Sequence, residues 1–176
     1  MSLYIITVIL TALASNITLP VVGGFRVTLG VVALFAMIHA FRLKRPILLA
    51  TVTGIVVVLV RILLESFRMP INPEVASNYF LEVFFYFGFG FLYYYSVIHN
   101  QSAYPLPLVI ALAISDAGGN FLEYLLRTLA ADQTWTNTSL VTILLAASVR
   151  SILIVFFIWI IKRIFTKFVD ERSSYD

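Results

Sequence analysis

The sequence contains no cysteine and only two histidines, His39 and His99. Without cysteine the chain can form no disulfide, has no thiolate nucleophile and cannot build a cysteine-based zinc site. The two histidines lie far apart in the sequence, so we expect no histidine-rich metal site either.

Charged residues are scarce as well. They account for 12% of the 176 residues, which is about half their share in a typical soluble domain. Hydrophobic residues make up 61% of the chain, and its net charge is only +3. This composition indicates an integral membrane protein that lies within a lipid bilayer. The placement of its few charges is then more informative than their sum.

The short motifs that mark common enzyme classes are missing too. The chain has no P-loop, no H-E-x-x-H, no G-x-S-x-G and no kinase signature. Paired carboxylates can do acid–base chemistry, but arginine partners would hold them ionised, which suits binding better than catalysis. We therefore expect no enzyme activity in the residues present, no cofactor and no nucleic-acid partner.

Six apolar stretches predict an all-α membrane protein, a bundle of six transmembrane helices. The stretches are Leu3–Leu19, Thr28–Phe41, Pro46–Phe67, Tyr79–Ile98, Pro105–Ala130 and Ser139–Ile161. Six crossings place both termini on one side. Seven basic residues would lie on that side, against two or three on the other, so the positive-inside rule predicts cytoplasmic termini. Residues 1–161 then form the membrane domain, and residues 162–176 form a cytoplasmic exit helix.

The fifth stretch carries a stripe of polar side chains. Asp116, Asn120, Glu123 and Arg127 follow the spacing i, i+4, i+7 and i+11, which places them along one side of a helix. Such a stripe cannot face lipid, so we expect it to face protein or a wet cavity.

Depth in the membrane divides the charges into two tiers. A rise of ~1.5 Å per residue places Asp116 and Arg150 both roughly 16 Å from the cytoplasmic ends of their helices. We therefore predict a buried ion pair between them. Arg61, Glu82 and Glu123 lie roughly 22–27 Å from the cytoplasmic side by the same count, and they form an outer tier.

These charges have two interpretations. They could pin the helices together, with Arg61–Glu65 and Glu123–Arg127 as i,i+4 pairs within single helices. They could instead line a polar cavity that opens outward between the last four helices. A charge near the bilayer centre costs at least ~2.5–3.5 kcal/mol, and small residues can pack helices without that cost. The balance favours the cavity.

Two further segments are candidates for completing such a cavity. The fourth stretch, which includes Tyr86, is rich in aromatic residues. It is either lipid-facing bulk or the wall of a pocket for a flat or apolar ligand. The connection Val21–Thr28 contains Gly23, Gly24 and Arg26, and we expect it to fold back over the outer mouth with Arg26 near the entrance.

Five runs occur in order along nearly the whole chain. They are FRVTLGVV (Phe25–Val32), TGIVVVLVRILLES (Thr53–Ser66), FFYFGFGFLY (Phe84–Tyr93), SDAGGNFLEYLLR (Ser115–Arg127) and ASVRSILIVFF (Ala147–Phe157). Together they resemble the membrane-embedded input region of a group of sensor histidine kinases from Gram-positive bacteria. The resemblance implies a homodimer in the bacterial cell membrane and a cytoplasmic kinase domain as the output of a two-component system. Lys162–Asp176 looks like the start of the exit helix of that family.

The six-span plan is also similar to the substrate-binding S components of energy-coupling-factor vitamin transporters. That resemblance implies a first loop that caps a ligand pocket near the outer face. The family's Ala-x-x-x-Ala pattern is not matched, because Ala12 and Ala14, and Ala33 and Ala36, have other spacings.

The leading hypothesis is a signal-input domain that binds a small ligand and relays the signal through its last helix. The alternatives are a vitamin-binding S component and a structural membrane scaffold. The candidate ligand-binding residues are Arg26, Arg61, Glu65, Glu82, Tyr86, Asn120 and Glu123, with Asp116 and Arg150 as the buried ion pair.

Overall fold

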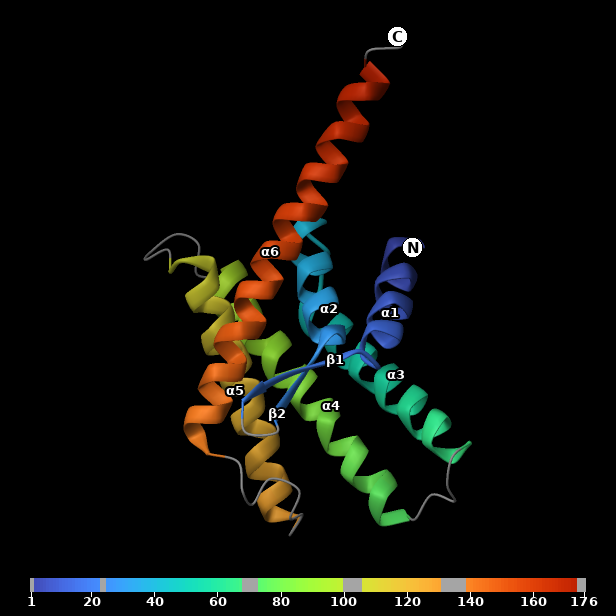
Figure 1. The fold of residues 1–176 in the computed structure, drawn as a ribbon, viewed down its shortest axis with the longest axis vertical. Helices are drawn as coiled ribbons and strands as arrows, with labels where there is room; N and C mark the ends of the chain where they lie inside the picture. Colours follow the sequence, from blue (N-terminus) through green and yellow to red (C-terminus); the bar gives the residue numbers. More distant parts are fainter. Residues whose placement is uncertain (1, 23–24, 68–72, 100–105, 131–138, 174–176) are drawn as a thin grey trace.

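The computed structural model describes residues 2–22, 25–67, 73–99, 106–130 and 139–173, and side chains for residues 2–20, 27–67, 76–99, 106–130 and 139–165. In this part the chain forms helices and one short hairpin (Figure 1). The elements are α1 (Ser2–Ala14), β1 (Thr18–Val22), β2 (Phe25–Thr28), α2 (Leu29–Ala40), α3 (Pro46–Ser66), α4 (Pro73–Tyr93), the π-helix η1 (Tyr94–His99), α5 (Leu108–Leu129) and α6 (Leu140–Ser173). The prediction of an all-α membrane protein is confirmed.

Four helical segments are long and apolar enough to cross a bilayer. They are Pro46–Ser66, Ala76–His99, Leu108–Leu129 and Leu140–Phe165. α1 and α2 have only 13 and 12 residues, which gives lengths of roughly 20 and 18 Å against a hydrocarbon core of ~30 Å. Four of the six expected spans therefore have the length of a full crossing, and the first two helices are shorter.

The connection between α1 and α2 is an antiparallel hairpin in which Thr18 pairs with Thr28 and Leu19 with Val27. Residues up to Leu19 were expected in the first helix, but α1 ends at Ala14. The Ser15 hydroxyl donates a hydrogen bond to the carbonyl oxygen of Ala12 at 2.7 Å. Local hydrogen bonds from side chains to the backbone compete with helix propagation, and the backbone of residues 18–22 and 25–28 is satisfied in the strand ladder instead.

The hairpin also lies deeper than expected. Figure 1 shows β1 and β2 at mid-height of the bundle, between the two ends of α4 and α5, rather than beyond those ends. Both strands contact α6. Non-helical backbone at membrane depth is tolerated only where protein or a wet cavity surrounds it, which is the position that the α6 contacts give the hairpin.

α2 lies in the interior of the bundle, in the half from which α6 extends (Figure 1). Its apolar side chains point in all directions, as expected for a helix surrounded by protein, and Leu34 and Phe35 are fully buried. The ring of Phe35 stacks on Phe89 of α4 with centroids 3.8 Å apart. α2 packs against α6 and α1, while α4 packs against α3 and α5.

The contact between α4 and α5 is close because of a glycine. A Cβ added at Gly119 would lie 2.9 Å from the carbonyl oxygen of Phe85 and 3.0 Å from the amide nitrogen of Phe89. These are backbone atoms of α4, which cannot move aside without shifting the helix. The neighbouring Gly118 differs, because a Cβ there would meet only the side chain of Leu92.

This difference predicts that alanine is tolerated at position 118 but not at position 119. We expect Gly119→Ala to lower the free energy of unfolding by ~1–3 kcal/mol, because it overpacks a helix–helix contact. Gly118→Ala is the matched control, since both changes gain the same helix propensity and Leu92 can rotate away. Reversible unfolding in mixed micelles measures both. Equal stability of the two variants would contradict the close approach at Gly119.

Candidate functional site

Charged and polar side chains gather inside the bundle, where α3, α4, α5 and α6 face one another. The stripe predicted on the fifth helix is present on α5. Asp116, Asn120, Glu123 and Arg127 are all buried. The stripe therefore faces protein, as the helical spacing predicted, and its neighbours come from the other long helices.

The centre of the cluster is an ion pair between α5 and α6. Arg150 Nη1 donates to Asp116 Oδ1 at 2.9 Å, and the two side chains are 5% and 0% exposed. Asn120 Nδ2 donates to the same carboxylate oxygen and to the Asp116 carbonyl oxygen. The guanidinium carbon of Arg150 lies 5.0 Å from the ring centroid of Phe85 on α4. The structure thus pairs Asp116 with Arg150, the two residues for which the sequence predicts the same depth in the membrane.

Several buried polar atoms of the four long helices, two of them in this pair, keep unused hydrogen-bonding capacity. Asp116 Oδ2, Arg150 Nε, Tyr86 Oη and Thr53 Oγ1 are buried and have no hydrogen-bond partner among the described residues. They come from α5, α6, α4 and α3 respectively. A buried polar atom left unsatisfied costs ~1–3 kcal/mol, so a polar molecule that bonded to these atoms would recover that energy.

A second ion pair joins α3 to α4. Arg61 Nη1 is paired with the carboxylate of Glu82, and Arg61 Nη2 donates to the carbonyl oxygen of Ser15 at 3.1 Å. The expected pair within α3, between Arg61 and Glu65, is therefore not the pair that forms. Glu82 faces Arg61 across the helix contact, while Glu65 is partly buried one turn further along α3.

A third ion pair lies within α5, as the i,i+4 spacing predicted. Arg127 Nε donates to Glu123 Oε1 at 2.8 Å, and Arg127 Nη2 donates to the carbonyl oxygen of Asn78 on α4 at 3.1 Å. Glu82 and Glu123 interact electrostatically with each other and with Arg127 and Arg150. The three pairs therefore form one network, called the charged cluster below, that connects the four long helices.

Tyr86 has other surroundings than expected, and the side-chain position of Arg26 is not described. Tyr86 does not stand in an open aromatic wall: it is fully buried, packs on Gly54 of α3 and lies edge-on to the ring of Phe85. Its hydroxyl is near Arg61 and Glu82. The Arg26 backbone pairs with Pro20 in the hairpin. The Arg26 side chain, Gly23 and Gly24 lie outside the described residues.

Sequence reasoning missed two groups in this region. Thr53 is one of two threonines in an apolar run and stands next to Gly54, and this proximity to a small residue was its available signal. The Ser15 carbonyl carries no signal, because every residue has one and only the fold brings it to Arg61.

The cluster combines paired charges with polar atoms that have unused hydrogen-bonding capacity. Its carboxylates are paired with guanidinium groups, and no group of three or more His, Cys, Asp or Glu side chains suited to a metal ion occurs in the part of the chain that the structure describes. Charges of both signs and unsatisfied hydrogen-bonding atoms are buried in this region, where electrostatic interactions are strong. Such a site can recognise a small molecule that carries both donors and acceptors.

The central pair predicts non-additive effects on stability. Asp116→Asn leaves Arg150 without its counter-charge, and a broken buried pair costs ~3–5 kcal/mol. Arg150→Gln should cost a similar amount for the same reason. The double variant removes both charges, so we expect it to be more stable than the sum of the single losses implies. A double-mutant cycle on the free energy of unfolding measures this coupling. Purely additive losses would contradict the pair.

No family model, no curated protein and no solved structure matches the chain. What the charged cluster does is therefore inferred from its own geometry and chemistry.

Proposed function

We propose that this chain is a transmembrane signal-input domain, which binds a small polar ligand at the charged cluster and transmits the event through α6 to a cytoplasmic kinase domain. The observation that carries the proposal is the position of Arg150. It is bound to Asp116 in the centre of the bundle and belongs to the helix that leaves the bundle.

α6 provides a direct mechanical connection. It is one helix from Leu140 to Ser173, and its apolar part ends at Phe165 (Figure 1). A continuous helix carries a rotation or shift at Arg150 to its far end, because its backbone hydrogen bonds resist bending. A ligand that competes for Asp116 or Arg150 therefore acts on the residues nearest the output.

The energy available for signalling is also adequate. A hydrogen bond to a charged group is worth ~1.5–3 kcal/mol, which corresponds to a shift of roughly 10- to 150-fold in an equilibrium between two helix packings. The ligand can shift that equilibrium only by its difference in affinity for the two packings. A ligand that bonds to Asp116 Oδ2 or Arg150 Nε has such a difference, because either bond alters the central pair.

The ligand class follows from the charges. The cluster contains three carboxylates and three guanidinium groups in ion pairs, so it offers no surplus of one sign. A dipolar molecule with donors and acceptors fits this balance better than a simple anion or cation. The residues of the outer tier, Arg61, Glu82 and Glu123, would contact it together with Tyr86 and Asn120.

The membrane context completes the proposal. The domain would lie in a bacterial cell membrane with both termini in the cytoplasm, as the distribution of Lys and Arg favours. Two copies would form a homodimer, by analogy with the kinases that the sequence resembles. A cytoplasmic kinase would then receive the signal from a pair of α6 helices.

The second candidate is a substrate-binding S component of an energy-coupling-factor transporter. It is favoured by the hairpin between α1 and α2, since the resemblance to S components implies a first loop that closes a ligand pocket. An S component would copurify with the transmembrane coupling subunit and its ATPases. A signal-input domain would instead alter the activity of a kinase fused to α6.

The orientation is tested by reporter fusions. Fusions after Arg45 and after Arg163 should both report cytoplasm, because basic connections are retained on that side. A fusion after Thr136 should report the outside. Paired alkaline phosphatase and fluorescent-protein reporters give opposite readings at each site. An external signal after Arg45 or Arg163 would contradict the orientation.

The binding site is tested by neutral substitutions in the outer tier. In a chimera with a kinase core, Arg61→Gln and Glu123→Gln should abolish the response of autophosphorylation to the stimulus, because each removes one partner of an ion pair beside the proposed ligand. Thr128→Val is the matched control. Thr128 is an exposed residue of α5 whose hydroxyl bonds only within its own helix.

Membrane insertion and dimerisation of all three variants should equal those of the parent. A normal response in both Arg61→Gln and Glu123→Gln, at normal expression, would rule out the outer tier as the binding site. It would leave helix packing as the role of these charges.

A further inference from the structure

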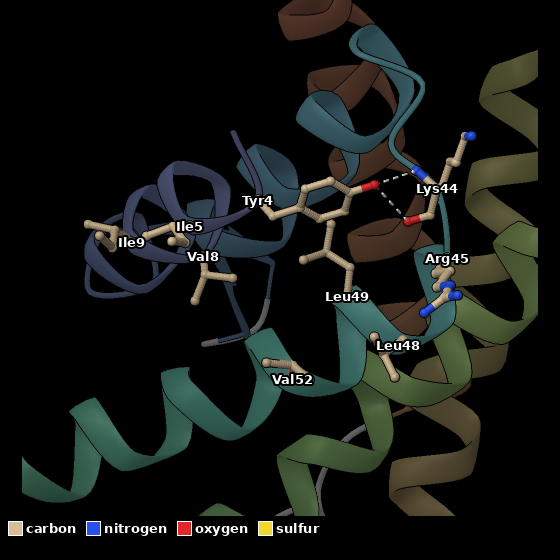
Figure 2. Close-up of a pocket in the computed structure, with 9 residues that line it drawn as sticks. All are labelled: Tyr4, Ile5, Val8, Ile9, Lys44, Arg45, Leu48, Leu49 and Val52. Carbon is tan, nitrogen blue, oxygen red and sulfur yellow. Dashed lines mark hydrogen bonds between the residues drawn. The ribbon is translucent and has the colours of Figure 1, made fainter. Parts of the chain in front are cut away.

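The end of the bundle where Lys44 and Lys162 lie has two adjoining hollows, away from the charged cluster. The first is an apolar groove of about 590 Å³ between α1 and α3. Its walls are Ile5, Val8 and Ile9 from α1, and Leu48 and Val52 from α3. Figure 2 shows these side chains on either side of the groove, with Lys44 and Arg45 at its end.

The second hollow, of about 520 Å³, is basic. It lies between the turn that joins α2 to α3, the π-helix η1 and α6. Its cationic lining residues are Arg42, Lys44, Arg45 and Lys162, and His39 lines it as well. No acidic side chain lines either hollow among the described residues. Lys44 and Arg45 line both, so the apolar groove and the basic hollow adjoin at these two residues.

The turn that supplies three of these cations is held in an unusual conformation. Arg42 and Arg45 have φ angles of 49° and 58°, a left-handed region that side chains other than glycine rarely occupy. The backbone amide of Lys44 donates to the Tyr4 hydroxyl at 3.1 Å (Figure 2). Strained turns persist where their surroundings fix them, and they are frequent at ligand clamps.

We propose that the two hollows together form a site for an anionic phospholipid. The phosphate lies in the basic hollow between Arg42, Arg45 and Lys44, and one acyl chain lies in the groove between α1 and α3. Guanidinium and ammonium groups are the preferred partners of phosphate oxygens. Basic pockets between membrane helices are suited to anionic headgroups in this way.

The apolar groove favours a phospholipid over a soluble phosphate as the occupant of the site. Its wall residues Ile5, Ile9 and Leu48 are half or more exposed in the single chain, which places the groove on the lipid-facing surface of a membrane protein. Tyr4 at its end has the amphipathic character of residues at the membrane interface. A free phosphate would use only the basic hollow, whereas a phospholipid matches the groove and the hollow in the order in which they adjoin.

The site also connects the first three helices to the last one. Lys162 follows the buried Ile158 on α6 by one turn and lines the same hollow as the turn between α2 and α3. A headgroup bound there would bridge that turn and α6 at the point where α6 leaves the bundle. This inference does not depend on the proposed ligand of the charged cluster.

The test uses the full chain, purified in detergent and stripped of lipid. Native mass spectrometry measures its affinity for phosphatidylglycerol, for phosphatidylcholine with the same chains, and for glycerol 3-phosphate. We expect phosphatidylglycerol to bind most tightly. Arg45→Gln should weaken that binding by about fivefold, the effect of one cation near a phosphate, while Arg45→Lys and the control Arg163→Gln should retain it.

A second pair of variants tests the groove. Val52→Phe fills it and should weaken phosphatidylglycerol binding without changing the binding of glycerol 3-phosphate. Ile55→Phe is the control, because Ile55 is exposed on the same helix but does not line the groove.

Three results would overturn the proposal. They are equal affinity for the two phospholipids, equal losses in Arg45→Gln and Arg163→Gln, and glycerol 3-phosphate binding as tight as that of phosphatidylglycerol. Circular dichroism of each variant confirms that its helices are intact before affinities are compared.

Discussion

A charged group inside a bilayer must find its partner within the protein, and the bundle is arranged around that requirement. Arg150 and Asp116 meet in the buried centre, and Phe85 covers the guanidinium from a third helix. This arrangement requires α4, α5 and α6 to lie close together, and Gly119 allows α4 to approach α5 at backbone distance. Packing and electrostatics are therefore one constraint in this protein. A change in either the small residues or the charges alters the same contacts.

Some polar atoms of the charged cluster are bonded in ion pairs, whereas others have no hydrogen-bond partner among the described residues. Its ion pairs fix the relative positions of the long helices, whereas Asp116 Oδ2 and Arg150 Nε still have capacity for hydrogen bonds. Half-satisfied polar networks are costly in a purely structural core, and the ligand proposed above would satisfy these groups. The same groups thus connect the stability of the bundle to the function proposed for it.

Helical periodicity explains why much of this arrangement could be predicted. The stripe of Asp116, Asn120, Glu123 and Arg127 depends only on the spacing within one helix, and the depth of Arg150 depends only on counting residues. Non-local contacts could not be derived in that way. Two carboxylates were available to Arg61, and the packing of α3 on α4, rather than sequence distance, selected Glu82. The end of α1 at Ala14 was missed for a similar reason, because a hydropathy pattern does not reveal that residues 18–28 pair with one another.

The bond between Arg61 and the Ser15 carbonyl has a consequence for the biogenesis of the protein. The two residues are 46 positions apart, so α1 and the hairpin leave the ribosome before the side chain that completes them exists. A helix of 13 residues is too short to cross a bilayer by itself, and unpaired strand backbone is not tolerated in lipid. The contact that holds the end of α1 against α3 can therefore form only after α3 has been synthesised, so the amino-terminal segment takes its final place late.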